Sequence, residues 1–428
     1  MSTYKITGGI PLHGEVTPTP NKNAVLPAIA AALLTDEIVT LHNVPKSSDV
    51  RIMLRLIRKM GGKISYSNMG NTVKINASTV DTNKLDAELS KKIQAASMFM
   101  APLLIRFKSA FMPIPGGCKL GTRPLDAFIG NMESMGATYE PTDKGFYLHA
   151  EKLKANKIWS WFPSVTGTEN LIMLASRVLG RTEIYNAACE PHVAELCHLL
   201  VSMGAKIEGI GSNKLIIEGV EELHGAEQTI ISDHLDIAEY VATAAVTGGA
   251  ITVKNAIPEH MDLILQAFQI LGIKTKYEGD NLTIPAEQKR KIKETVKGNI
   301  FDVKALFWPM FPPDVIHSLV VTALASEGTI IFHNSFYEYG FFFVEELAKL
   351  KGNVVMADPH RILTFGPTKW RPGTIVAPNI IAATKSLLVA ALAAEGTSIL
   401  HDETDMLMRR YPTIIEDYKS LGAKIEKV

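Results

Sequence analysis

The sequence has 428 residues, and its 44 basic and 44 acidic side chains give a formal net charge of zero. A chain of this length has room for two or three domains, each with a sizeable core. The balanced charge argues against nucleic acid or a membrane surface as a partner. Three cysteines cannot cross-link so long a chain, which fits a reducing cytosol.

The first long apolar run is AVLPAIAAALL, residues 24–34. It follows a predicted strand, has no small-residue cleavage site before Asp36, and is too short to span a bilayer. We therefore expect a buried helix of a cytoplasmic protein, and neither a signal peptide nor a membrane anchor.

A short phrase, typically Leu/Met-Gly-Ala-Lys-Ile, recurs along the whole chain at intervals of about 70 to 80 residues. Each copy follows a helix-like stretch such as 50–59 and precedes a β-prone segment such as 63–67 or 206–209. The six copies lie at residues 60–64, 135–139, 203–207, 271–275, 350–354 and 421–425. Six regular copies favour an internal repeat over a common helix terminator.

Other segments complete the repeat unit. A strand that ends in a turn precedes most of the helices, and small apolar helices such as 387–396 precede several of these strands. The strands with their turns lie at residues 39–45, 182–187, 251–258, 330–335 and 398–402. One unit therefore reads strand, helix, strand, helix, strand, strand, and six units predict an α/β protein with two domains of three units each.

The second copy departs from this pattern. Where other copies carry a strand and turn, it carries PIPGGCKLGTRP, residues 113–124, which is too rich in proline and glycine for a helix or strand. Cys118 lies in this loop near Lys119 and Arg123, whose charges would favour a reactive thiolate. By itself the window leaves a working thiol and an incidental surface cysteine both open.

The other cysteines, Cys189 and Cys197, lie near His192, Glu195 and His198, so a metal site has to be considered. The spacing matches no zinc-binding pattern, and Cys197 and His198 fall in an apolar helical run. We therefore expect buried, unreactive thiols and no metal.

Three motifs carry a resemblance to a known family. The segments NKNAVLP (21–27), PGGCKLGTRPLD (115–126) and SVTGTEN (164–170) make the chain resemble the UDP-N-acetylglucosamine enolpyruvyl transferases, from about residue 4 to the C-terminus. The resemblance implies two lobes, each an inside-out α/β barrel of three units, with a deep cleft between them. One lobe would span 22–231, and the other would join 1–21 to 232–428.

The resemblance also implies a reaction. The enolpyruvyl group of phosphoenolpyruvate would move to the 3-hydroxyl of UDP-N-acetylglucosamine, with release of phosphate, as the first committed step of peptidoglycan precursor synthesis. No cofactor or metal is implied, nor any nucleic-acid or membrane partner, and we expect a monomer or weak homo-oligomer. The Cys118 loop would close over the cleft and would be the target of epoxide inhibitors such as fosfomycin.

Site residues are implied one position at a time. Cys118 matches the proton donor, Asp314 the carboxylate that faces the sugar hydroxyl, and Arg409 an arginine near phosphate, a role that Arg410 could also fill. Lys22 and Asn23 match the pair that contacts phosphoenolpyruvate. The other expected substrate contacts are Gln94, Arg123, Pro124, Leu125, Asp126, Ala127, Ser164, Val165, Gly167 and Phe336.

Several family arginines are missing. The corresponding positions fall at Gln94, near Gly340, around residues 381–382, and at His234. Candidates to restore part of the positive charge are Lys91, Lys92, Lys385, His234 and Arg410, although lysine cannot make the bidentate fork of arginine. Three readings stay open: the cell-wall enzyme with a rearranged cation set, a related transferase with another acceptor, and a non-catalytic relative that binds a sugar nucleotide.

Overall fold

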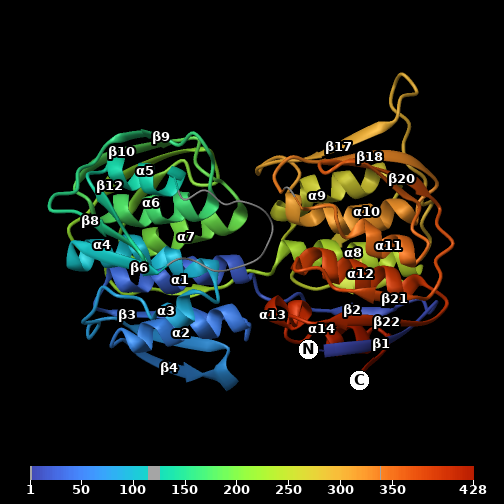
Figure 1. Cartoon of the computed structure of the whole chain (residues 1–428), viewed down its shortest axis with the longest axis horizontal. Helices are drawn as coiled ribbons and strands as arrows, with labels where there is room; N and C mark the ends of the chain where they lie inside the picture. The colour runs from blue at the N-terminus through green and yellow to red at the C-terminus, as the bar shows by residue number, and fades with distance from the viewer. Residues whose placement is uncertain (1, 114–125, 338) are drawn as a thin grey trace. The chain divides into compact units, whose positions relative to one another are not determined.

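The computed structural model describes residues 2–113, 126–337 and 339–428 (Figure 1). These residues form two compact units. We call residues 20–113 and 126–231 the first unit, and residues 2–19, 232–337 and 339–428 the second unit. The division into lobes of 22–231 and of 1–21 with 232–428 stays a prediction.

The described part of each unit contains three small sheets, one for each repeat. In the first unit their strand orders are β13 (Glu227–Thr229), β3 (Ile38–His42), β5 (Thr72–Asn76), β4 (Lys63–Ser67); β6 (Ser109–Pro113), β8 (Gly145–His149), β7 (Thr138–Thr142); and β11 (Lys206–Glu208), β12 (Lys214–Gly219), β10 (Gly180–Tyr185), β9 (Lys157–Trp159). In the second unit they are β15 (Lys276–Glu278), β16 (Asn281–Ile284), β14 (Ile251–Val253), β2 (Gly14–Val16); β17 (Phe301–Ala305), β18 (Gly328–Asn334), β20 (Arg361–Gly366), β19 (Val354–Asp358); and β21 (Thr374–Val376), β22 (Gly396–Asp402), β1 (Ser2–Gly8), β23 (Lys424–Lys427).

The strand pairing shows that different repeats share the same sheet topology. In the third repeat β10 runs parallel to β9 and antiparallel to β12, and β18 is placed in the same way between β17 and β20. Strands from remote parts of the chain complete two sheets of the second unit: β1 pairs with both β22 and β23, and β2 runs parallel to β14. The N-terminal segment therefore belongs to the second unit.

Within each unit the sheets lie outside and a set of inner helices lies inside (Figure 1). The inner helices are α1 (Lys22–Ala31), η3 (Gln94–Phe99) continued by α4 (Met100–Phe107), and α6 (Val165–Arg177) in the first unit, and α8 (His234–Thr247), α10 (Ile316–Leu324) and α12 (Ile381–Ala393) in the second. Nearly all of their residues are buried. A helix that is apolar on every side is stable only when other elements surround it, so the predicted inside-out arrangement is confirmed.

Six outer helices end in the recurring phrase. They are α2 (Ser48–Lys59), α5 (Asp126–Ser134), α7 (Pro191–Ser202), α9 (Pro258–Ile270), α11 (Val344–Lys349) and α14 (Ile414–Ser420). At each end two successive backbone N–H groups donate back to carbonyls of the last turn, as Gly204 does to Val201 and Ala205 to Leu200. This closure needs a left-handed residue.

Glycine supplies that left-handed residue in five of the six ends. Gly204, for example, has φ of 105°. In the looser fifth copy Lys351 takes the same place with φ of 68°, and its N–H still donates to Ala348. The six-copy repeat predicted from the sequence is therefore confirmed in its hydrogen bonding.

Other predicted elements are confirmed as well. The run 24–34 forms α1 and the 3₁₀ turn η1 (Ala32–Leu34), and both are buried. Cys197 lies on α7, 1% exposed. Among the described residues, no helix combines the length and apolar character needed to cross a membrane.

Candidate functional site

The inner helices of the first unit run parallel, and their C-terminal ends are tied together by arginines. Arg106, at the end of α4, donates from Nε to the carbonyl of Leu33 and from Nη2 to that of Thr35. Arg177, the last residue of α6, donates to the carbonyl of Leu34 at 3.2 Å. Because the C-terminal ends of α1, α4 and α6 meet, the N-terminal ends of these inner helices lie together at the opposite end of the unit.

Most of the predicted substrate contacts of the first unit lie where these helices begin. Lys22 and Asn23 open α1, Gln94 opens η3, and Val165 follows the N-cap Ser164 of α6. Backbone N–H groups point out of such helix ends, and the helix dipoles add partial positive charge. None of the three first turns contains an acidic residue. The end of this unit is therefore suited to anions such as phosphate or carboxylate.

The cation at this end is Lys22, which is 8% exposed. Its Nζ lies 2.8 Å from Oδ2 of Asp49 in the first turn of α2, whose side chain is itself buried. The side chain of Asn21 caps α1 by accepting from the N–H groups of Asn23 and Ala24. The ammonium group is thus held in one place by a buried carboxylate before any substrate arrives.

The start of α6 is held just as firmly. Ser164 accepts from the N–H of Gly167 at 3.2 Å, and a Cβ added to Gly167 would press against the Ser164 side chain. Asn170 donates to the carbonyl of Thr166 and accepts from the N–H of Ala101 on α4. Side-chain hydrogen bonds therefore fix the predicted nucleotide-phosphate contacts Ser164, Val165 and Gly167 to the neighbouring inner helix.

One residue at this end was missed from the sequence. Glu169 on α6 is fully buried, and neither of its carboxyl oxygens has a hydrogen-bond partner among the described residues. Burial, with a smaller contribution from the charge of Glu190, raises the pKa of Glu169 well above its ordinary value. Burial therefore favours the neutral form of the carboxyl, which reduces negative charge near the anion-binding end.

Some predicted residues cannot be placed. Cys118, Arg123, Pro124 and Leu125 lie outside the described residues, so their roles stay predictions. Asp126 is exposed at the start of α5, and Ala127 follows it in the same helix.

In the second unit the inner helices are parallel too, and they are linked through their first turns. On α8 Asp236 pairs with Lys385 of α12, and Glu239 accepts at 2.6 Å from Ser318 of α10. All four residues lie in the first two turns of their helices. The three N-terminal ends of this unit therefore also lie together.

The predicted carboxylate Asp314 lies at this end, in the 3₁₀ turn η4 (Pro313–Val315) that leads into α10. Arg410 is close enough for its charge to interact with that of Asp314, but its guanidinium is buried and paired with Asp233, with Nη2 2.6 Å from Oδ2. Arg409 lies beside it on α13 (Met406–Arg410) and is half-buried. Of the two arginines considered for the phosphate role, Arg410 is thus already held by a carboxylate.

His234 cannot restore the charge of a missing arginine, so that suggestion is wrong. It is the first residue of α8 and 3% exposed. Desolvation, with the charges of His260 and Arg410, lowers the pKa of His234 to about 3. The imidazole is therefore neutral at any physiological pH.

Lys385 is not a replacement cation either. It is 1% exposed, pairs with Asp236, and lies 4.2 Å from the ring centroid of Tyr411. A buried lysine held by a carboxylate and an aromatic ring is internally neutralised. Lys91 and Lys92 are exposed.

The position near Gly340 has no room for an arginine. A Cβ added to Gly340 would run into the side-chain amide of Asn334, which is fully buried. The carbonyl of Gly340 also accepts from His317 Nε2 at 2.9 Å. The loss of an arginine here is therefore built into the packing of the loop after β18.

The predicted contact Phe336 belongs to an aromatic group that we did not anticipate. Its ring lies 4.9 Å from that of Phe307 and 4.5 Å from that of Tyr337, while Trp308 contacts His234 at 6.1 Å between centroids. These side chains are partly exposed. The aromatic runs 306–311 and 336–343 were the signal that could have revealed them.

The remaining cysteines behave as expected. Burial, with the charge of Glu190, raises the pKa of Cys189 to about 11, and burial with Glu169 raises that of Cys197 to about 12. Thiols with such pKa values are unreactive near neutrality. Within the described ranges, no group of three or more His, Cys, Asp or Glu side chains is arranged to hold a metal ion.

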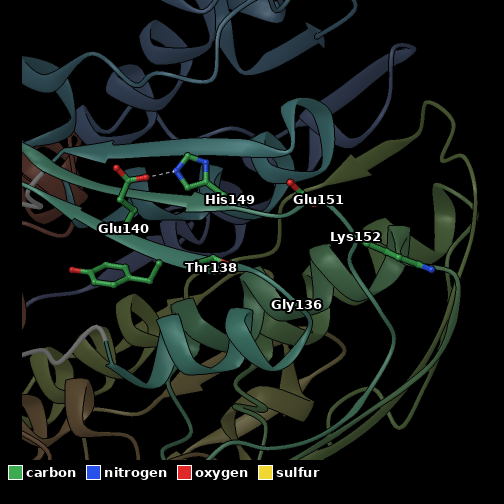
Figure 2. Close-up of a pocket in the computed structure, with 7 residues that line it drawn as sticks. Gly136, Thr138, Glu140, His149, Glu151 and Lys152 are labelled. Atoms are coloured by element: carbon green, nitrogen blue, oxygen red, sulfur yellow. Dashed lines mark hydrogen bonds and ion pairs between the residues drawn. The ribbon is translucent and has the colours of Figure 1, made fainter.

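A surface hollow of about 610 Å³ lies over the β7–β8 hairpin (Figure 2). Across it, His149 Nε2 lies 2.9 Å from Oε2 of Glu140. The other lining residues are Gly136, Thr138, Tyr139, Glu151 and Lys152. None of these residues is among the predicted site positions, so we assign the hollow no role in the chemistry.

Comparison with known proteins identifies the family. Residues 6–418 match the model of the EPSP synthase (3-phosphoshikimate 1-carboxyvinyltransferase) family. The chain is 39% identical to the UDP-N-acetylglucosamine 1-carboxyvinyltransferase of Treponema denticola, covering 100% of this chain and 99% of that protein, and 38% identical to that of Borreliella burgdorferi with the same coverage.

Solved structures agree on the fold. The enolpyruvyl transferase NikO from Streptomyces tendae has a TM-score of 0.88 at 21% identity and covers 100% of this chain, which covers 99% of NikO. An EPSP synthase from Acinetobacter baumannii has a TM-score of 0.77 at 16% identity, with 100% of both chains covered. The fold is therefore that of the enolpyruvyl transferases. Within this class the chain belongs to the UDP-N-acetylglucosamine 1-carboxyvinyltransferase family.

Proposed function

We propose that this protein transfers the enolpyruvyl group of phosphoenolpyruvate to the 3-hydroxyl of UDP-N-acetylglucosamine and releases phosphate. This is the first committed step of peptidoglycan precursor synthesis. The observation that carries the proposal is the full-length match to relatives of that name at 38–39% identity. A cytoplasmic location and a monomeric or weakly oligomeric state are part of the proposal.

The reaction consists of an addition and an elimination. In the addition the sugar oxygen bonds to C2 of phosphoenolpyruvate while C3 gains a proton. In the elimination the bond from C2 to the phosphate oxygen breaks and C3 loses a proton, which restores the double bond. The protein must supply an acid for C3, a base for the hydroxyl, and positive charge for phosphate and carboxylate.

The proposed roles follow these needs. Cys118 delivers the proton to C3, and Asp314 takes or guides the proton of the hydroxyl. Lys22 and Arg409 stabilise the anionic groups, and Asn23 and Gln94 hydrogen-bond to them. Pro124, Leu125, Asp126, Ala127 and Phe336 complete the acceptor site, together with Arg123, Ser164, Val165 and Gly167. Support comes from Lys22, which is held by Asp49 at the shared helix end of the first unit.

A second candidate function has its own support. A different nucleotide-linked or phosphorylated acceptor is favoured by the loss of positive charge at His234, Lys385 and Gly340. Each charge-assisted contact to phosphate or carboxylate contributes roughly 1.5 to 3 kcal/mol. Several such losses would weaken phosphoenolpyruvate binding or change the acceptor.

The deciding experiment is single-turnover release of phosphate from phosphoenolpyruvate, with and without UDP-N-acetylglucosamine. We expect release that depends on UDP-N-acetylglucosamine. Release only with another acceptor would support the second function, and no release with any nucleotide sugar would contradict both. Cys118→Ser should abolish most of the turnover, because a hydroxyl is a much poorer acid than a thiol, and Cys118→Asp should keep part of it.

A further inference from the structure

A buried carboxylate connects all three inner helices of the second unit. Glu239, on the second turn of α8, is 2% exposed. Ser318 on α10 donates to its Oε2 at 2.6 Å, and Ser386 on α12 donates to its Oε1 at 3.2 Å. Burying a carboxylate costs several kcal/mol, and an apolar side chain could fill the same space. Its presence in the core therefore calls for an explanation other than packing.

The link to α10 leads directly to the proposed base. Ser318 lies four residues after Asp314, so the two are one helical turn apart. Thr322, further along α10, and Ser326, just beyond its C-terminal end, donate their hydroxyls to the carbonyl four residues earlier, as buried helical hydroxyls commonly do. Ser318 instead donates across to Glu239. Its hydroxyl is the connection between α8 and the turn that carries Asp314.

Charged and titratable groups surround Glu239 on several sides. Asp236 and Tyr240 share its helix, Lys385 comes from α12, and Tyr411 and Tyr418 come from the end of α13 and from α14. Burial, opposed by Lys385 and by the two serine hydroxyls, raises the pKa of Glu239 to about 7. The carboxyl therefore changes charge near neutral pH.

We propose that Glu239 is a positioning residue for the enolpyruvyl transfer, because through Ser318 it sets the place of the Asp314 carboxylate. Ionised, it accepts from Ser318 and holds the first turn of α10 against α8. Protonation of Glu239 weakens the charge-assisted bond from Ser318 to the strength of a neutral one, so that the first turn of α10 is held less firmly against α8. The inference rests on the proposed function, and Glu239 itself touches no substrate.

The test compares kcat, KM and pH profiles of Glu239→Gln and Ser318→Ala with those of the wild type. Both variants should lose about 10- to 100-fold in kcat, as for a small misplacement of a reacting group, with KM for the nucleotide changed less than twofold. We also expect the kcat of the wild type to change near pH 7, where Glu239 titrates, and both variants to lose this change. Ser318→Thr, which keeps the hydroxyl, should recover most of kcat.

Ser326→Ala is the matched control, since Ser326 is a fully buried serine just beyond the C-terminal end of α10, and its hydroxyl donates to the carbonyl of Thr322 in the last turn of that helix. It should leave kcat and its pH profile unchanged. Equal losses in Ser326→Ala and Ser318→Ala, or a Glu239→Gln protein with wild-type kcat and pH profile, would overturn the proposal. If Glu239→Gln does not fold, Ser318→Ala decides alone, because it leaves Glu239 and its bond from Ser386 in place.

A readout that needs no turnover separates this inference from the proposed function. Amide hydrogen exchange at residues 314–318, corrected for intrinsic rates, should be faster in Glu239→Gln and Ser318→Ala than in Ser326→Ala. A wild type that releases no phosphate contradicts the proposed function, whereas unchanged exchange at these amides contradicts the positioning role.

Discussion

The two units present the same set of helix ends with opposite electrostatics. In the first unit no acidic residue occupies the first turns of α1, η3 or α6, and burial raises the pKa of Glu169 and favours its neutral form. In the second unit Asp233 caps α8, Asp236 follows in its first turn, and Asp314 leads into α10. Helix dipoles favour anions in both units, but in the second unit these carboxylates offset part of that potential at α8 and before α10. One scaffold therefore provides an end suited to anions and, separately, an end that carries carboxylates, among them Asp314, the base that we propose.

We expect the largest effect from removing the carboxylate charge of Asp314 in the second unit. Asp314→Asn should lower kcat by about 10²- to 10⁴-fold, since the hydroxyl would lose its base, while the nucleotide still binds. Single-turnover phosphate release and titration with UDP-N-acetylglucosamine measure the two effects. Asp302→Asn, on β17 of the same unit, is the control and should stay near wild type. Wild-type turnover in Asp314→Asn would contradict the role of this carboxylate as the base.

We expect the next largest effect from breaking the buried ion pair Lys22–Asp49 of the first unit. Lys22→Met should cost about 3 kcal/mol of stability because it leaves Asp49 buried without its cation. The double variant Lys22→Met/Asp49→Asn should regain much of that loss. Denaturant unfolding of the single and double variants measures the coupling.

The corresponding pair of the second unit sharpens the contrast. There the double variant Arg410→Met/Asp233→Asn should regain less, because Asp233 also accepts from the N–H of Leu235 as the cap of α8. Equal recovery in both units would show that the two pairs do the same structural work.

The neutral histidine predicts an acid-sensitive second unit. Because the pKa of His234 is lowered to about 3 in the folded protein and is ordinary in the unfolded chain, the unfolded state binds more protons between these values. Stability is therefore lost as pH falls below about 6.5. From pH 7 to pH 5 the loss due to His234 is about 2 kcal/mol.

His234→Gln should remove that part of the pH dependence, whatever its effect at pH 7. Unfolding free energies at both pH values test this, with His149→Gln as the control, since His149 is 40% exposed in the first unit. An unchanged slope in His234→Gln would mean that the buried imidazole is protonated in the folded protein.

The smallest effect tests the repeat itself. Of the six outer-helix ends described, five have glycine at the left-handed position and one has Lys351. Its φ of 68° is unfavourable for a residue with a Cβ. Lys351→Gly should stabilise the protein by about 1 kcal/mol, less the added freedom of the unfolded chain. Gly204→Ala, at the equivalent end of the first unit, should destabilise it. Thermal unfolding measures the stability of both variants. A Lys351→Gly protein less stable than the wild type would contradict the claim that the backbone at Lys351 is strained.

Local patterns made much of the site predictable. The family motifs that contain Lys22, Asn23, Ser164 and Gly167 also contain the signals that begin a helix. The predicted contacts therefore lie at helix N-termini. Asp314 was predicted from the resemblance of residues 311–314 to the family, and it lies in a turn that leads into α10. The aromatic group around Phe336 was incompletely predicted, because its member Phe307 comes from the segment after another strand, β17.

The sequence by itself determined the repeat, the α/β class and the order of elements, because these depend on periodicity and on glycine at helix ends, which are local. Only the tertiary structure decided which cations remain for a substrate. His234, Lys385 and Arg410 are alike in the sequence as candidates, but burial neutralises the first, and Asp236 and Asp233 hold the other two. Charge in a protein interior depends on desolvation and on partners brought from distant segments, and these exist only once the helices have packed.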